Sequence, residues 1–385
     1  MTEGGTNRGL GAALAAAILP DGADTLLLRA CLLDTASARR SWDDWRAMVG
    51  DPKAMLETET RGLKGMLPMI DAAFRRHGLP GPDGMGIYLK AATLREELRT
   101  RLIAEFLTGA VDALTQDQVP FTLLGGIAAA YSVYDRPSQR HCHAIDLLVA
   151  EADRARTAAA LARAGFTPLA KSATEFRHTE RLALHLWPDI AFHPHHRAPD
   201  GGVAARAKPL DVAGRTVQGA CATDRFIMAL SRGASTPERR NLRWACDATL
   251  TAPFVDWPLF LAETARRHMA LPFAPLCRHQ AQSLDADIPA DVLTRLDALA
   301  AEARALDREA ALAGALTGLQ ATRHALAAPG VDTATRLAIG RYLALPSAQC
   351  LAWSYGPAGS VKRAVQRLHR PACYVVSRTR RRLAT

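Results

Sequence analysis

Apolar residues recur at helical spacing through most of the first 116 residues. Between residues 24 and 76 the repeating positions are Leu26, Leu27, Ala30, Leu33, Trp42, Trp45 and Met48. After a Gly- and Pro-rich loop at residues 78–86, the stretch 88–115 predicts one long amphipathic helix. Its apolar positions are Leu94, Leu98, Leu102, Phe106 and Leu114. The pattern therefore predicts a helical N-terminal region over residues 1–116.

The pattern changes at Val119. Short apolar runs bounded by turn residues predict strands over residues 121–124, 145–149, 181–187 and 190–195, with helices over 127–133 and 151–164. Pro188-Asp189 predicts a hairpin between the last two strands, with a solvated aspartate in its turn. This order indicates a compact mixed-sheet core over residues 117–218. Helical spacing returns over 219–350, so the fold class is α+β, a small core flanked by helices.

The net charge of +10 and the pI of about 9.6 depend largely on the last residues. The tail over residues 351–385 contains eight Lys and Arg residues and no acid after Gly356. A solvated tail is one interpretation. A contact with nucleic acid or another polyanion is the other, and it is the weaker one because Tyr374 alone interleaves aromatic character with the arginines.

No apolar run approaches the 18 residues that a membrane-spanning helix needs. The run at residues 10–19 follows Glu3 and a single basic residue, Arg8, which is unlike a secretory signal. The seven cysteines are scattered and form no C-x-x-C pair. These features predict a cytoplasmic protein with neither a disulfide framework nor a structural zinc knuckle, and Cys246 and Cys277 as core residues.

Candidate chemistry begins at Gly125-Gly126, between a predicted strand and a predicted helix. Exposed backbone N–H groups at a helix N-terminus suit a phosphate chain. A tight turn with a purely structural role explains the same two glycines. Asp146 lies inside the apolar run 145–149. A carboxylate in a buried strand is costly unless it is paired or holds a metal, so a salt bridge and a metal site both remain open.

Several short motifs occur in a fixed order. They are Leu124-Gly125-Gly126, Ala128, Tyr134, Arg140, Asp146, Leu147-Leu148-Val149, Ile190-Ala191-Phe192-His193 and Arg243-Trp244-Ala245-Cys246-Asp247. Together they resemble the bacterial family of uncharacterised nucleotidyltransferases over about residues 119–250. The resemblance implies nucleotidyl transfer from a nucleoside triphosphate to a hydroxyl or phosphate of a peptide, sugar or other acceptor. It also implies that Gly125, Gly126 and Arg140 bind the phosphates of the nucleotide, and that Asp146 binds Mg²⁺ or Mn²⁺. Asp247 either hydrogen-bonds the nucleotide or forms an ion pair between helices.

The chain departs from this family at two of the three expected metal ligands. Ala144 stands at the first acid of the Asp-x-Asp motif, and Ala191 stands at the third acid position. An alanine methyl cannot bind Mg²⁺. Two hypotheses follow: an active nucleotidyltransferase, or an inactive and repurposed module that binds a nucleotide, a peptide or a partner protein.

Histidines crowd the same region at positions 141, 143, 193, 195 and 196. If the strands 145–149 and 190–195 are neighbours, His193 approaches Asp146. A His/Asp site would favour zinc, manganese or iron over magnesium. The alternative is that these histidines are surface residues or are hydrogen-bonded within the protein.

Overall fold

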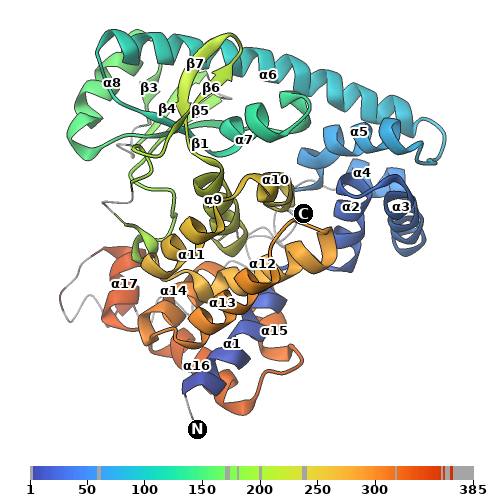
Figure 1. Ribbon diagram of the computed structural model, residues 1–385, viewed down its shortest axis with the longest axis vertical. Helices are drawn as coiled ribbons and strands as arrows, with labels where there is room; N and C mark the ends of the chain where they lie inside the picture. Colours follow the sequence, from blue (N-terminus) through green and yellow to red (C-terminus); the bar gives the residue numbers. More distant parts are fainter. Residues whose placement is uncertain are drawn as a thin grey trace.

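A computed structural model describes residues 3–58, 62–169, 174–179, 182–198, 202–235, 241–316, 319–356, 359 and 365–366. The fold is α+β, as the sequence predicts: one mixed sheet with helices before and after it (Figure 1). The N-terminal helices are α1 (Glu3–Ile18), α2 (Gly22–Leu32), α3 (Thr35–Val49), α4 (Pro52–Thr58), the short 3₁₀ helix η1 (Leu63–Met66), α5 (Leu67–His77) and the long α6 (Met85–Gln116).

The core elements are β1 (Thr122–Leu124), α7 (Gly125–Val133), η2 (Pro137–Gln139), β2 (Ala144–Leu148), η3 (Glu151–Asp153), α8 (Arg154–Arg163), β3 (Thr167–Pro168), β4 (Glu175–Thr179), β5 (Leu182–Trp187), η4 (Pro194–His196), β6 (Lys208–Val212) and β7 (Arg215–Gly219). The C-terminal helices are α9 (Ala222–Ser235), α10 (Arg243–Thr251), η5 (Ala252–Phe254), α11 (Trp257–Arg266), α12 (Ala270–Leu284), α13 (Ala290–Ala301), α14 (Ala305–Ala315), α15 (Leu319–Ala327), α16 (Thr333–Ala344) and α17 (Ala348–Tyr355).

The strands form one sheet in the order β3-β4-β5-β2-β1-β7-β6. The central strand β2 pairs with β1 antiparallel, which sets Asp146 opposite Leu124, and with β5 parallel, which sets Asp146 beside His185. The partner of β5 on its other side is β4. The apolar pattern of the sequence did not predict β3, β4, β6 or β7. In the β6–β7 hairpin the turn residues Ala213 and Gly214 both have positive φ, as a tight primed turn requires.

The predicted strand over residues 190–195 is wrong, and so is the hairpin turn at Pro188-Asp189. Asp189 is buried, and its carboxylate accepts hydrogen bonds from the N–H groups of Ala191 at 2.8 Å and Ala198 at 3.0 Å. It also pairs with the buried Arg267. The side chain of Asp189 thus takes the N–H of Ala191 that a strand would use, and residues 194–196 turn into the short helix η4, so this segment does not add a strand to the sheet.

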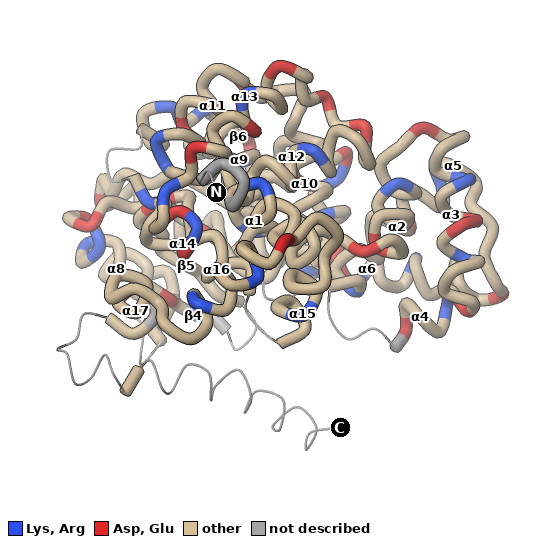
Figure 2. Tube along the Cα trace, turned by 90° about the horizontal axis from the view of Figure 1, so that it is seen from below, with Lys and Arg blue, Asp and Glu red and all other residues tan. Residues whose placement is uncertain are grey.

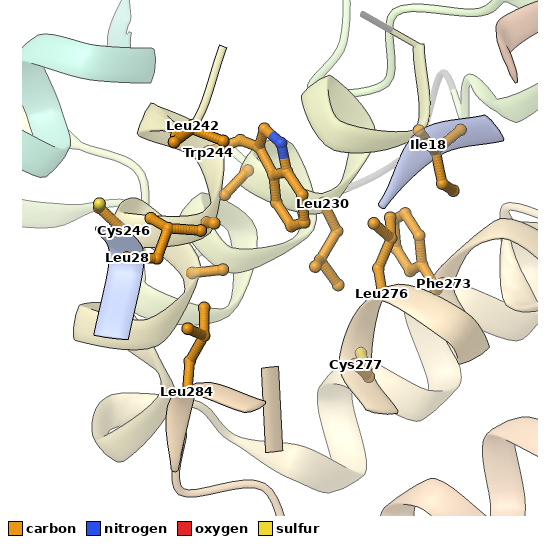
Figure 3. Packing of buried hydrophobic residues seen from close by; sticks show 14 of the residues in the cluster. Ile18, Leu28, Leu230, Leu242, Trp244, Cys246, Phe273, Leu276, Cys277 and Leu284 are labelled. Carbon is orange, nitrogen blue, oxygen red and sulfur yellow. The ribbon is translucent and has the colours of Figure 1, made fainter. Parts of the chain in front are cut away.

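Two hydrophobic clusters hold the fold together. One lies between α6, the sheet and α8, and includes Leu114, Leu123, Ile145 and Phe176. The other joins the N-terminal helices to the C-terminal ones. Figure 3 shows part of it, with residues of α9 and α10 facing residues of α12, α1 and α2. The apolar run at residues 10–19 belongs to this cluster, because α1 packs against α12, α13 and α15. Cys246 and Cys277 are buried in it as predicted.

The long helix α6 presents its apolar residues differently from a simple amphipathic helix. Its buried side includes Leu107 and Leu114, packed on the sheet, whereas Leu94, Leu98 and Leu102 are 51%, 60% and 52% exposed. The polar residues Thr93 and Glu96 are buried instead. The apolar positions 94, 98 and 102 therefore form a stripe on the outer side of the molecule.

Basic and acidic residues are interspersed over the described part of the chain, as Figure 2 shows. The predicted basic tail after Gly356 lies almost entirely outside the described residues. Within the described residues no single helix meets the length and hydropathy required to cross a membrane. One bent pair, Asn7–Ile18 with Gly22–Leu32, meets them jointly across a 73° break.

Candidate functional site

The turn between β1 and α7 is built against Asp146. Gly125 begins α7 with φ of +65°, a conformation that side chains other than glycine rarely adopt. A methyl group at Gly125 would overlap the Oδ2 atom of Asp146, and one at Gly126 would lie 3.2 Å from the guanidinium of Arg140. The two glycines therefore let the buried side chains of Asp146 and Arg140 lie against the first turn of α7.

Both carboxylate oxygens of Asp146 have partners within the protein. Oδ2 accepts a hydrogen bond from Nη2 of Arg232 at 2.9 Å. Oδ1 accepts one from Nε1 of Trp187 at 2.8 Å and one from Nδ1 of His185 at 3.1 Å. Burial alone would raise the pKa of Asp146, but the Arg232 charge and the two hydrogen bonds lower it below its ordinary value. The site thus holds an ionised carboxylate that a side chain already neutralises.

A second ion pair lies beside the first. Arg140 binds Asp247 with two parallel hydrogen bonds of 2.7 Å, from Nε to Oδ1 and from Nη2 to Oδ2. Tyr134 donates to the same carboxylate at 2.8 Å. Burial alone would lower the pKa of Arg140, but the Asp247 carboxylate raises it well above its ordinary value. Bidentate geometry and burial make this pair a fixed part of the structure.

The structure thus brings five of the six predicted site residues together: Gly125, Gly126, Arg140, Asp146 and Asp247. Their assignment to nucleotide or metal binding remains a prediction. The cavity beside them, lined by residues that include Gly125, Arg225, Arg232 and Asp247, has a volume of only about 10 Å³.

The predicted approach of His193 to Asp146 rested on a strand over residues 190–195, which does not form. The strand beside β2 is β5, so the histidine that contacts Asp146 is His185. The ring of His193 packs instead against Trp353 and His196. Burial and the neighbouring His195 and Arg197 lower the pKa of His193 to about 4, so the ring is neutral at physiological pH.

The residues around Asp146 do not fit the divalent metal that the family resemblance implies. Its Oδ2 faces a guanidinium at hydrogen-bond distance, where a cation would be repelled. At the first acid position that the resemblance implies, the half-buried Ala144 of β2 carries a methyl group. The assignment of Ala191 to the third acid position depended on the strand over residues 190–195, which does not form. Across the described residues, no group of three His, Cys, Asp or Glu side chains is placed to hold a metal ion.

The sequence motifs do not predict which side chains hydrogen-bond to Asp146. His185 and Trp187 alternate along β5, and this period-two pattern could have marked them as sharing one face of the sheet. Arg232 lies on α9, 86 residues from Asp146 in the chain, and no motif marks it.

A much larger cavity lies at the opposite end of the same strands. It has a volume of about 720 Å³, and its lining includes Val111, Phe121, Leu148, Val203 and Val217. Leu148 and Thr122 lie at the far end of the β1–β2 pair from Gly125 and Asp146, so this cavity is separate from the predicted site.

The α+β fold is consistent with a nucleotidyltransferase family protein. The family model described as "uncharacterised nucleotidyltransferase" matches residues 63–285, more than half of the chain. The chain belongs to this family, as its sequence motifs predict. No curated protein and no solved structure matches the chain.

Proposed function

We propose that this chain is a member of the nucleotidyltransferase family whose transfer site has become an internal ion-pair network, and that it acts as a binding or scaffold module. The observation that carries the proposal is the 2.9 Å contact between Arg232 and Asp146. A metal-dependent transferase needs that carboxylate to hold a divalent cation that bridges the phosphates. Here the carboxylate is neutralised by a cation that belongs to the chain.

Three further features support the proposal. The carboxylate of Asp146 occupies the space beside Gly125 at the start of α7, the position at which a phosphate would approach the helix dipole. Arg140 is held by Asp247 and is buried, so a phosphate would have to displace a bidentate carboxylate to reach it. The cavity of about 10 Å³ beside Gly125 has room for about one water molecule.

Nucleotidyl transfer from a nucleoside triphosphate to a peptide, sugar or other acceptor is the second candidate, because the family model favours it. In that case Arg232 would leave Asp146 when Mg²⁺ or Mn²⁺ and the nucleotide bind. The two candidates differ in one measurable property, the metal dependence of nucleotide binding.

Calorimetric titration of the full chain with each nucleoside triphosphate tests the proposal. The titrations are run with Mg²⁺, with Mn²⁺ and with a chelator, on the wild type and on Asp146→Asn. A matched control is Asp297→Asn, which alters an exposed aspartate that pairs with Arg278. We expect no metal-dependent nucleotide binding by any of the three proteins. Micromolar, metal-dependent binding by the wild type and the control that is lost in Asp146→Asn would establish the second candidate instead.

A further inference from the structure

Several basic side chains meet where α6, the segment before β2 and the start of α10 come together. Two imidazole rings lie in this group, with the Nε2 atoms of His141 and His143 3.0 Å apart. On α6, the Oε2 atom of Glu96 lies 2.6 Å from Nδ1 of His141, and Nε of Arg99 lies 3.5 Å from the same oxygen. His143 and the side chain of Arg99 are exposed, so the group is open to solvent.

Arg243, the first residue of α10, joins this group without an acidic partner. Its Nη1 donates to the carbonyl oxygen of His141 at 3.0 Å, and its Nε donates to Oδ1 of Asn241 at 2.9 Å. Both acceptors are uncharged. Among the described residues, no carboxylate lies within 4.0 Å of this half-buried guanidinium, and its Nη2 has no hydrogen-bond partner. Arg243 therefore keeps donors that the described chain does not use.

The neighbouring Arg140 shows what a carboxylate does for a guanidinium at this place. Arg140 donates to the same carbonyl oxygen of His141, at 2.5 Å, but Asp247 also binds it, and its pKa is raised. For Arg243 the shift is opposite, because burial and the charge of Arg140 lower its pKa to about 10. A lowered pKa means that the surroundings disfavour the positive charge. Arg243 thus carries a charge that no contacting carboxylate balances.

The linked charges of this group leave one positive charge in excess. Three guanidiniums stand against two carboxylates, and the five residues are Arg99, Arg140, Arg243, Glu96 and Asp247. The pKa of His143 reflects the excess, because partial desolvation and the charges of His141 and Arg243 lower it to about 3. Positive charge that is taken out of water and left unpaired is costly. An anion of matching chemistry would remove this cost.

We propose that Arg243 and His143 form a binding site for a phosphate-type oxyanion that needs no metal ion. A guanidinium presents N–H groups in a planar fork that matches phosphate oxygens, and an imidazolium adds a charged donor. A divalent cation does not suit the site, because it would meet the guanidiniums that already disfavour a proton on His143. The exposed ring of His143 leaves the site accessible from solvent.

This inference goes beyond the proposed function and does not rest on it. Asp146 is hydrogen-bonded by Arg232, Trp187 and His185, and neither Arg243 nor His143 is among its partners. The anion site therefore stands whether or not Asp146 accepts a metal. Inorganic phosphate and the phosphoryl group of a nucleotide share the chemistry that the site recognises.

Calorimetric titration of the full chain with inorganic phosphate, with a chelator present and at constant ionic strength, tests the site. We expect saturable binding by the wild type. Arg243→Gln should weaken binding at least tenfold, because it removes the guanidinium that lacks a carboxylate partner, and His143→Gln should weaken it severalfold. Arg278→Gln is the matched control, because Arg278 is an exposed arginine that pairs with Asp297. It should bind phosphate as the wild type does.

Thermal unfolding adds a measurement that a purely structural role of Arg243 would not change. Phosphate should raise the Tm of the wild type and of Arg278→Gln but not that of Arg243→Gln, since only a bound anion stabilises the folded state. If Arg243→Gln does not fold, His143→Gln decides the test, because its side chain is exposed.

Titration with ATP under the same conditions distinguishes the two sources of the phosphate group. Binding of ATP no tighter than that of phosphate identifies the phosphate group alone as the ligand. Tighter binding of ATP that Arg243→Gln still weakens identifies a nucleotide. A wild type that binds neither anion overturns the proposal, and so does binding that the Arg243 and His143 variants leave unchanged. Metal-dependent binding that Asp146→Asn abolishes would contradict the proposed function alone.

Discussion

Substituting Gly125 with alanine tests how tightly the turn and Asp146 are built together. The first cost is conformational, because φ at Gly125 is +65° and an alanine there loses about 1 kcal/mol. The second is steric, because the added methyl would overlap Oδ2 of Asp146 and force the carboxylate away from Arg232.

The magnitude follows from the burial of the pair. Breaking a fully buried ion pair costs about 3–5 kcal/mol. Arg232 is one-third exposed, so solvent recovers part of this and about 2–3 kcal/mol is the better figure. With the conformational cost, Gly125→Ala should lower the free energy of unfolding by about 3–4 kcal/mol, a large share of a typical total.

Gly214 supplies the matched control. Its φ is +81°, but no atom lies within 4 Å of the position where a methyl would stand. Gly214→Ala should therefore show the conformational cost alone, about 1 kcal/mol. Guanidinium denaturation of both variants and the wild type, with equal slopes, gives the comparison. Equal losses for the two alanine variants would refute the packing of Asp146 against this turn.

Two further predictions concern buried charge. Asp247→Asn removes the charge that Arg140 binds inside the protein and should lower the free energy of unfolding by about 3–5 kcal/mol. Asp297→Asn, at an exposed pair, should lower it by less than about 1 kcal/mol. Similar losses for the two variants in denaturant unfolding would contradict the prediction. Burial, with His193 nearby, lowers the pKa of His196 to about 3, so the folded state takes up its proton less readily than the unfolded state does. The free energy of unfolding should therefore fall as pH drops below about 6.5, and His196 should account for about 2 kcal/mol of the loss at pH 5. His196→Asn should remove this part of the pH dependence. If the wild type and the variant lose stability equally as pH falls, His196 is not the group responsible.

The sequence predicted the secondary structure best where neighbouring residues alone determine the backbone conformation. The strand before Gly125, the Gly125-Gly126 turn, α7 and the strand that carries Asp146 form as predicted. Glycine allows the positive φ of this turn, and the short apolar runs favour buried strands on either side of it. Residues 190–195 do not form a strand, and there the side chain of Asp189 binds the backbone N–H of Ala191, which a strand would use in its ladder, and that of Ala198 just beyond. Alternating apolar character cannot reveal such a side-chain contact.

Other features depend on contacts distant in the chain. Arg232 contacts Asp146 across 86 residues, and the packing of α9 against α7 and α10 places it there. The side of α6 that is buried depends on its packing against α5, η2, α8 and the sheet. Spacing alone therefore predicted the leucines at 94, 98 and 102 as part of an apolar face, although they are exposed. Helical periodicity identifies an apolar face but not what covers it.

The central claim is that Arg232 stands where the family resemblance expects a metal. The most direct measurement is anomalous diffraction from crystals soaked in Mn²⁺ and a non-hydrolysable nucleoside triphosphate. We predict that Arg232 keeps its contact with Asp146 and that no manganese peak occurs beside the carboxylate. A manganese peak within ligand distance of Asp146, with Arg232 displaced, would contradict the claim and restore a metal-dependent nucleotidyltransferase.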